Sequence, residues 1–348
     1  HYPLRRQRQM CIRDRICTGI AVVIIPIVCL YLLQCLLVPK YASDIKEGAM
    51  IKEYYNSEKN HDVLILGDCE VYENISTVTM WENYGISSYI RGSAEQLIWQ
   101  SYYLLEDTLK YEKPQVVILN VLAMTESDAK NEAYNRMTLD GMKLSKYKIA
   151  SVRESMTEEE NMASYIFPLL RYHSRWSELS SEDFRYMWKT PSVTTNGYLM
   201  QKGVRPVTTI PKAAPLANYT FSDRNMEYLD KIYSLCKDNG INLVLMKAPS
   251  VYPHWYDEWD KQVSDYAYEH GILYLNTINE AGNIGIDYTT DTFDYGQHLN
   301  VEGAEKLSLY LGEHLVKNFR LTDHRQDESY KNAWQTIVNK YYEEKQGD

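Results

Sequence analysis

The chain has 348 residues, of which 45% are hydrophobic, and a formal net charge of −10. Residues 1–15 contain five Arg and one Asp, or +4, so residues 16–348 carry −14. A chain this acidic argues against nucleic acid or an anionic membrane surface as a partner.

The first 15 residues are treated separately from the fold. The stretch "MCIRDR" (10–15) is typical of a translated sequencing-adapter end joined to an assembled gene. Genuine coding sequence is the alternative. We therefore assign residues 1–15 to a cytoplasmic tail that is either native or foreign, and exclude it from fold reasoning.

A long apolar run follows, from Ile16 to Val38. A run of this length spans a bilayer core as a helix, and Pro26 is tolerated there as a kink. The arginines before the run and Lys40 after it predict a cytoplasmic N-terminus. We expect a single-pass signal anchor in the plasma membrane with an extracytoplasmic C-terminal domain. A cleaved signal peptide would have a shorter apolar region and a small-residue cleavage site.

Cysteine usage bears on how the exterior domain is held together. Outside the tail and the apolar run only Cys69 and Cys236 remain. Two cysteines in about 300 residues are no disulfide framework, so a hydrophobic core must hold the domain. A bridge between these two cysteines is the alternative.

Strand and helix patterns alternate after residues 39–60, which read as a polar stalk or a first helix. Short apolar, β-branched runs predict strands at 62–67, 86–92, 113–121, 241–250 and 272–277. Helical spacing predicts helices at 94–111, 224–240, 257–271, 300–319 and 328–346. This alternation predicts a three-layer α/β/α domain, over residues 61–320, with five parallel strands covered on both faces. Residues 321–348 are assigned to a C-terminal helix.

The connection between the third and fourth strands is too long to be a simple crossover. It runs from residue 122 to 222, which predicts a helical insertion or a lid. Within it, "RYHSRW" (171–176) places Arg171 and His173 where they could receive an anionic group of a polymer. An ordinary helix anchored by its aromatic residues is the alternative.

Chemistry-bearing residues follow the strands of the predicted sheet. In open parallel sheets ligands bind beyond the carboxyl ends of the strands. Those positions hold a nucleophile, amide donors and a histidine flanked by carboxylates, the parts needed for acyl transfer. They are Gly67-Asp68-Cys69, Gly92-Ser93, Asn120, 247–250 and "DTFDYGQHLNVEGA" (291–304).

The order of these residues resembles the SGNH (GDSL-like) hydrolase family. Gly67-Asp68-Cys69 stands where the family has Gly-Asp-Ser, and Gly92, Asn120 and His298 fall on its later blocks. The resemblance covers roughly residues 60–320 and implies a flavodoxin-like sheet. With the apolar run it also resembles the DltD-like and alginate-acetylation-like proteins of bacterial envelopes, which act on acyl groups of surface polymers.

The resemblance implies a role for each of these residues. Cys69 would be the nucleophile and His298 its base, while Gly92 and Asn120 would stabilise the oxyanion. The family's last motif has an aspartate three residues before its histidine. In this chain Tyr295 occupies that position before His298. We expect Asp294 to orient the histidine, and Asp291 is the alternative.

Each position also has a structural interpretation. Cys69 could be a small residue packed in a tight turn, and Gly92 could serve a positive φ. Glu70 next to Cys69 complements a helix N-terminus, but its charge would raise the pKa of the thiol. Asn120 could cap the segment that follows it.

Further residues border the predicted cleft. Lys247 and Trp255 follow the fourth strand, and Trp255 with its aromatic neighbours could stack on sugar rings. The sequence has no Cys/His pattern with zinc spacing, no phosphate loop and no dinucleotide fingerprint. We therefore expect neither a metal nor a cofactor.

Three functions follow from these residues. The first is a membrane-anchored esterase or O-acyltransferase that acts on an acylated glycan or a small ester, with a membrane-bound acyltransferase as a fitting partner. The second is a catalytically silent SGNH-like domain that binds a glycan or an envelope partner. The third is a thiol-sensing ectodomain that uses Cys69 and Cys236.

Overall fold

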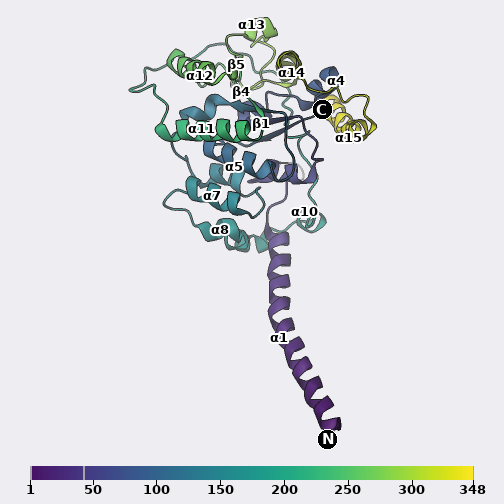
Figure 1. The fold of residues 1–348 in the computed structure, drawn as a ribbon. Coiled ribbons are helices and arrows are strands. Elements are labelled where there is room, and N and C mark those ends of the chain that lie inside the picture. Colours follow the sequence, from purple (N-terminus) through teal and green to yellow (C-terminus); the bar gives the residue numbers. More distant parts are fainter. Residues whose placement is uncertain (1, 42–43, 348) are drawn as a thin grey trace. The chain divides into compact units, whose positions relative to one another are not determined.

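The computed structural model describes residues 2–41 and 44–347, with side chains from residue 14 onward (Figure 1). The arginines on which the orientation prediction depends therefore lie, except for Arg15, outside the described side chains. The chain forms two compact units. One comprises residues 45–162 and 192–348, and the other comprises residues 1–44 and 163–191.

A five-stranded parallel sheet is the centre of the larger unit. Its strands are β1 (Val63–Gly67), β2 (Ser88–Gly92), β3 (Val116–Asn120), β4 (Asn242–Lys247) and β5 (Leu273–Asn276). They lie in the order β2-β1-β3-β4-β5, and every neighbouring pair is parallel. This is the flavodoxin-like order, so the predicted α/β class and the five strands are confirmed.

One face of the sheet packs against α4 (Thr77–Tyr84), α14 (Val301–Asn318) and α15 (Glu328–Gln346). The core on this face combines alternate strand residues such as Ile65 and Ile118 with Leu311 of α14 and Trp334 of α15. The Trp334 ring stacks on Trp81 of α4, with centroids 4.9 Å apart. The predicted C-terminal helix is thus part of the larger unit's core.

The other face is covered by α5 (Ile98–Thr108) and α11 (Asp223–Asp238), which pack together (Figure 1). Beside α11 lies α12 (Asp257–His270), where Tyr266 donates a hydrogen bond to Asp230. Helices on both faces explain why the strands read as continuous apolar runs.

Helix ends follow the signals in the sequence. The Asn300 side chain caps α14 by accepting a hydrogen bond from the Gly303 amide, and α12 ends at Gly271 in the left-handed conformation. The short helix α4 was not predicted. Its signals were Ser76, which caps it, and Gly85 in the left-handed conformation after its last residue.

Part of the predicted stalk is packed into the larger unit. Residues 49–56 form α2 (Ala49–Glu53) and the 3-10 helix η1 (Tyr54–Asn56), and Ile51 and Tyr54 are fully buried. The Glu53 carboxylate accepts hydrogen bonds from the backbone of Val193 and Thr194. Residues 49–56 are therefore helical and packed within the larger unit.

The long connection contains short helices followed by extended chain. It holds η2 (Val121–Thr125), α6 (Glu132–Leu139), α7 (Lys146–Ser155), α8 (Met162–Ile166), α9 (Leu169–Tyr172), η3 (His173–Ser177) and α10 (Ser181–Arg185). Residues 163–191 belong to the smaller unit, while the rest of the connection belongs to the larger one.

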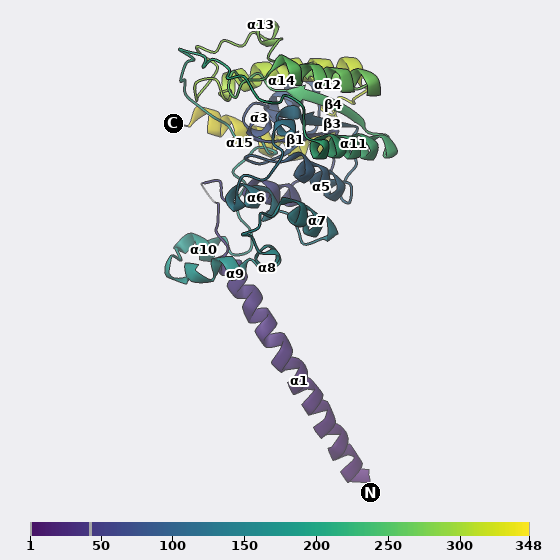
Figure 2. The same cartoon turned by 90° about the vertical axis from the view of Figure 1, so that its left-hand side faces the viewer.

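The smaller unit contains α1 (Tyr2–Leu37), which is apolar from Ile16 onward apart from Thr18 and Gln34. Within the described part of the chain, its segment Asp14–Leu37 is the one helix long and apolar enough to cross a membrane. Near the C-terminal end of α1, residues 163–191 pack against it through α9, η3 and α10 (Figure 2).

Candidate active site

The carboxyl ends of the strands bring the predicted site residues to one edge of the sheet. Gly67 pairs with Gly92, and Asn120 pairs with Met246, one residue before Lys247. A Cβ on Gly92 would lie 3.0 Å from the Gly67 carbonyl oxygen and 3.0 Å from the Val71 side chain. Gly92 therefore serves a close backbone approach to the turn after β1, and its φ is not positive.

Cys69 is the first residue of α3 (Cys69–Tyr72), directly after that turn. Asp68 caps this short helix, because its carboxylate accepts a hydrogen bond from the Glu70 amide at 3.0 Å. Cys69 is half-buried. The thiol thus stands at the start of a helix.

A tight loop before α14 presents His298. Its Nδ1 lies 2.6 Å from the Asp294 carboxylate, which also accepts the His298 amide at 2.8 Å. Tyr295 adopts a φ of 66° and Gly296 a φ of 89°, and a bridge between Thr292 and Leu299 closes the loop. These two left-handed residues absorb the shift in register, so Asp294 contacts the ring although it stands four residues before it.

The alternative carboxylate, Asp291, has other partners. It pairs with Lys306 at 2.6 Å and accepts the Asp287 amide at 2.8 Å. Its side chain is buried at the start of the loop. Asp294, and not Asp291, is therefore the carboxylate that holds the histidine ring.

Glu73 supplies a second carboxylate that the sequence analysis did not single out. It lies one turn after Cys69, and one of its oxygens is 3.3 Å from His298 Nδ1. Its other oxygen accepts a hydrogen bond from Gln201 at 2.7 Å. The neighbouring Asn74 accepts the Leu299 amide at 2.7 Å. Through these contacts the histidine loop is fixed against the chain that follows Cys69.

A buried network of charges lies beneath the Cys69 turn. Lys247 Nζ is 2.6 Å from the Glu70 carboxylate, and both side chains are at most 1% exposed. Ser250 also donates to Glu70, and the Asn120 amide donates to Asp68 at 3.1 Å and to Glu70 at 3.0 Å. This network joins the ends of β1, β3 and β4.

This network gives two predicted site residues a different role. Asn120 is 1% exposed and both its amide hydrogens are donated to carboxylates, so it positions the turn and presents no donor to an oxyanion. Lys247 is fully buried, so it neutralises Glu70 and does not reach a substrate. A buried charge without a partner would be strongly destabilising, which explains this arrangement.

The surroundings keep the Cys69 thiol protonated. Burial, followed by the charges of Asp68, Glu73 and Glu70, raises its pKa well above the ordinary value. Burial also raises the pKa of Asp68, as does the charge of Glu70. These effects outweigh the stabilisation that a helix N-terminus gives to a thiolate.

His298 is shifted toward its charged form. Burial opposes the charge, but the hydrogen bond to Asp294 and the negative charge of Glu73 outweigh burial, so its pKa is raised above the ordinary value. Among the described residues, no hydrogen bond joins the Cys69 sulfur to the ring. At rest the thiol is therefore neutral, and the histidine held by Asp294 and Glu73 binds a proton readily.

The remaining candidate substrate residues are Trp255, Arg171 and His173. Trp255 is 8% exposed, and its indole donates to Asp260 while its ring contacts Phe221 and Trp259. Its exposed area is too small for a stacking platform. Arg171 and His173 belong to the smaller unit, where His173 Nδ1 contacts the Leu170 carbonyl.

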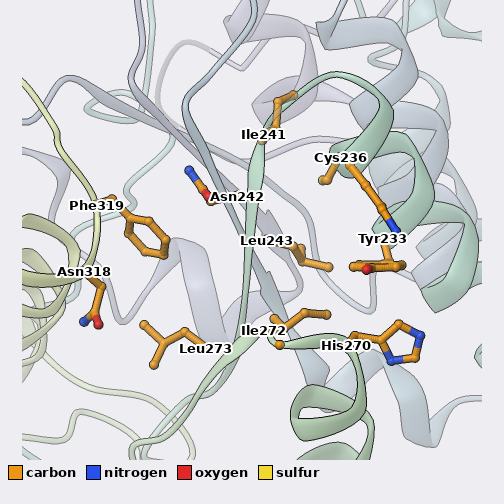
Figure 3. A pocket seen from close by; sticks show the side chains of 12 residues that line it. Tyr233, Cys236, Ile241, Asn242, Leu243, His270, Ile272, Leu273, Asn318 and Phe319 are labelled. Carbon is orange, nitrogen blue, oxygen red and sulfur yellow. The ribbon is translucent and has the colours of Figure 1, made fainter.

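The opposite edge of the sheet holds a cavity of about 340 Å³ (Figure 3). It is lined by the ends of α11, α12 and α14 and by the starts of β4 and β5, and Cys236 is among its lining residues. Both Cys69 and Cys236 are free thiols. Since they lie at opposite edges of the sheet, a bridge between them is wrong, and the thiol-sensing pair loses its basis. No cluster suited to hold a metal is found in the described part of the chain.

Among known proteins, distant similarity is found to solved structures alone. No protein-family profile matches the chain, and no curated protein matches it. A solved structure from Desulfitobacterium hafniense, described as a lipolytic protein of the G-D-S-L family, is 13% identical with a TM-score of 0.37, over 73% of this chain and 99% of that one. A GDSL-like lipase from Bacteroides thetaiotaomicron is 12% identical with a TM-score of 0.39, over 78% and 100%. A protein described as an acylhydrolase from Bacteroides fragilis is 12% identical with a TM-score of 0.36, over 75% and 89%.

Proposed function

We propose that this chain is a membrane-anchored, extracytoplasmic SGNH-like esterase or O-acyltransferase, with Cys69 as nucleophile, His298 as base and Asp294 as the orienting acid. One observation carries the proposal. The Asp294–His298 pair, joined at 2.6 Å, is fixed by Glu73 and Asn74 against the segment that begins at Cys69. A nucleophile, a base and an orienting acid at one sheet edge are what acyl transfer requires.

The reaction begins with the thiol proton. His298 in its neutral form accepts that proton, and the Cys69 sulfur attacks the ester carbonyl to form a tetrahedral intermediate. Its negative oxygen is stabilised by backbone amides, of which those of Cys69 and Gly92 lie at the turn. His298 then donates its proton to the departing alcohol, and a thioester remains on Cys69.

The second half of the reaction resolves the thioester. A hydroxyl group attacks the acyl carbon while His298 takes its proton, and His298 then returns this proton to the departing sulfur, which leaves as the thiol. Water as the acceptor gives hydrolysis, and a glycan hydroxyl gives O-acyl transfer. Throughout, Asp294 holds the ring and stabilises the imidazolium.

The apolar helix α1 suggests where the acceptor is found. Asp14–Leu37 has the length and composition of a membrane span, which would place the site near an envelope surface. An acylated envelope polysaccharide is therefore the proposed substrate, and a DltD-like partnership with a membrane-bound acyltransferase is the proposed setting.

A test uses the purified full chain and a small acyl ester such as p-nitrophenyl acetate. We expect turnover in the wild type and its loss in His298→Ala. His314→Ala is a matched control, because His314 is a half-buried histidine on α14 whose Nδ1 contacts the Tyr310 carbonyl. Equal turnover in the wild type and in His298→Ala would contradict the proposal.

A second function, a silent domain that binds a glycan or an envelope partner, is favoured by the environment of the thiol. The pKa of Cys69 is raised by burial and by three carboxylates, which opposes thiolate formation. Absence of turnover, together with glycan binding that survives Cys69→Ala, would favour this function.

A further inference from the structure

The smaller unit carries an aromatic surface that the proposed reaction does not use. In the described part of the chain, every phenylalanine or tryptophan side chain that is exposed lies within residues 163–191. Trp176 is 72% exposed, Trp188 67%, and Phe167 and Phe184 are each 60% exposed. Exposed aromatic side chains gathered in this way mark an interaction surface.

This segment is attached to the end of the apolar helix. Arg175 donates to the carbonyl of Leu37, the last residue of α1, and also pairs with Asp183 at 3.1 Å. The Trp188 ring lies 6.5 Å from the ring of Tyr31, in the last two turns of α1. The short helices α8, α9 and α10 therefore gather at one end of the candidate span (Figure 2).

Basic groups mark the same level of α1. Lys40 Nζ lies 2.6 Å from the Cys35 and Val38 carbonyls, which a helix end leaves without partners in the helix. Arg175 donates to the Leu37 carbonyl, so two cations lie where α1 ends. Cations at the end of an apolar helix are typical of the level at which a span leaves the hydrocarbon.

The composition of the segment fits a lipid interface. Residues 163–191 hold four basic and three acidic side chains, in a chain whose net charge is −10. Tryptophan is enriched where membrane hydrocarbon meets water, because its ring is apolar and its N–H remains hydrated. Short helices with exposed aromatic residues lie in that plane.

We propose that residues 163–191 form an interfacial collar that inserts Phe167, Trp176, Phe184 and Trp188 into the lipid surface around the outer end of α1. The occupant of this surface is the bilayer itself. The inference rests on the proposed membrane anchor, because the end of α1 defines the depth in the membrane at which the collar lies. The collar would hold the anchor at a fixed depth.

Tryptophan fluorescence tests the collar directly. The chain has seven tryptophans and none of them lies in α1, so quenching by lipid reports on other segments. The full chain is reconstituted in phosphatidylcholine vesicles whose acyl chains are brominated close to the headgroup. We expect quenching in the wild type and loss of most of it in Trp176→Phe/Trp188→Phe, which keeps the apolar surface.

A matched control removes a tryptophan of the larger unit. Trp259→Phe changes a half-buried indole that packs against Phe221 and should leave the quenching unchanged. If the wild type shows no quenching, or if the double variant is quenched like the wild type, the collar is wrong. A surface that binds a protein partner instead would give the first of these results in vesicles of lipid alone.

Flotation separates the two proposals. Vesicles that carry the full chain to the top of a density gradient, without quenching of Trp176 and Trp188, contradict the collar and leave the anchor in place. A chain that stays at the bottom of the gradient contradicts the anchor and the collar with it.

Discussion

Two free thiols of this protein lie at opposite edges of one sheet. Cys69 follows β1 at the carboxyl edge, while Cys236 lies in the last turn of α11, beside the start of β4. The pKa of Cys236 is raised to about 12, and burial is the cause of this shift. At Cys69, burial acts together with Asp68, Glu73 and Glu70.

The difference shows what distinguishes a candidate nucleophile from a packed thiol. Both thiols are neutral at rest, so the pKa alone does not separate them. What separates them is the neighbourhood, because Cys69 begins the segment that holds a histidine with two carboxylates on its ring. Cys236 instead lines a cavity at the other edge of the sheet.

The largest expected effect comes from removing each thiol in turn. Cys69→Ala should reduce turnover of a small ester by about 1,000-fold or more, since the nucleophile is lost. Cys236→Ala should leave turnover within about twofold and lower the free energy of unfolding by about 1–2 kcal/mol through loss of packing. Steady-state kinetics and urea unfolding of both variants measure this. An equal loss of turnover in the two variants would show that Cys69 is no more important for catalysis than Cys236.

The buried charges beneath Cys69 should dominate the stability of its edge. Lys247→Met leaves Glu70 buried without its counter-ion, and the free energy of unfolding should fall by about 3–5 kcal/mol. Lys261→Met removes an exposed helix pair with Asp265 and should cost about 0.3–0.5 kcal/mol. Denaturant unfolding of the two variants compares them. A small change in Lys247→Met would mean that the pair does not hold the turn.

The smallest effect is a shift in pH dependence. Only neutral His298 accepts the thiol proton, so turnover should rise with pH through the raised pKa of the ring. Glu73→Gln removes a charge that raises the pKa values of both His298 and Cys69. The rising part of the rate profile should therefore move to lower pH.

The control for this shift is Glu313→Gln, which changes an exposed carboxylate on α14. Its rate profile should coincide with that of the wild type from pH 5 to 9. If the rising part of the pH–rate profile lies at the same pH in Glu73→Gln and in the wild type, Glu73 does not act through the histidine.

Much of this edge could be predicted because it depends on residues close in sequence. The apolar runs predict the five strands, and the residues after them predict which side chains meet. The role of Asp294 could also be predicted, since this residue lies in the same loop as His298. Local patterns thus sufficed for the strands, while the family resemblance implied the order of the sheet and the acid–base pair.

The remaining features depend on contacts between distant segments. Glu73 contacts His298 only because the loop before α14 packs on the end of α3. Asn120 and Lys247 lie at strand ends, as predicted, and both contact the Glu70 carboxylate. The sequence pattern around Glu70 does not indicate that its side chain points into the protein. Tertiary packing likewise turned part of the expected stalk into buried helix.

The most direct test of a catalytic Cys69 is the intact mass of the protein after brief exposure to an acetyl ester. We predict an added acetyl group on Cys69 that hydroxylamine removes, as it does a thioester. The adduct should be absent in Cys69→Ala and retained in Cys236→Ala. An acetyl group that persists in Cys69→Ala, or no adduct at any pH from 6 to 9, would contradict nucleophilic catalysis by this thiol.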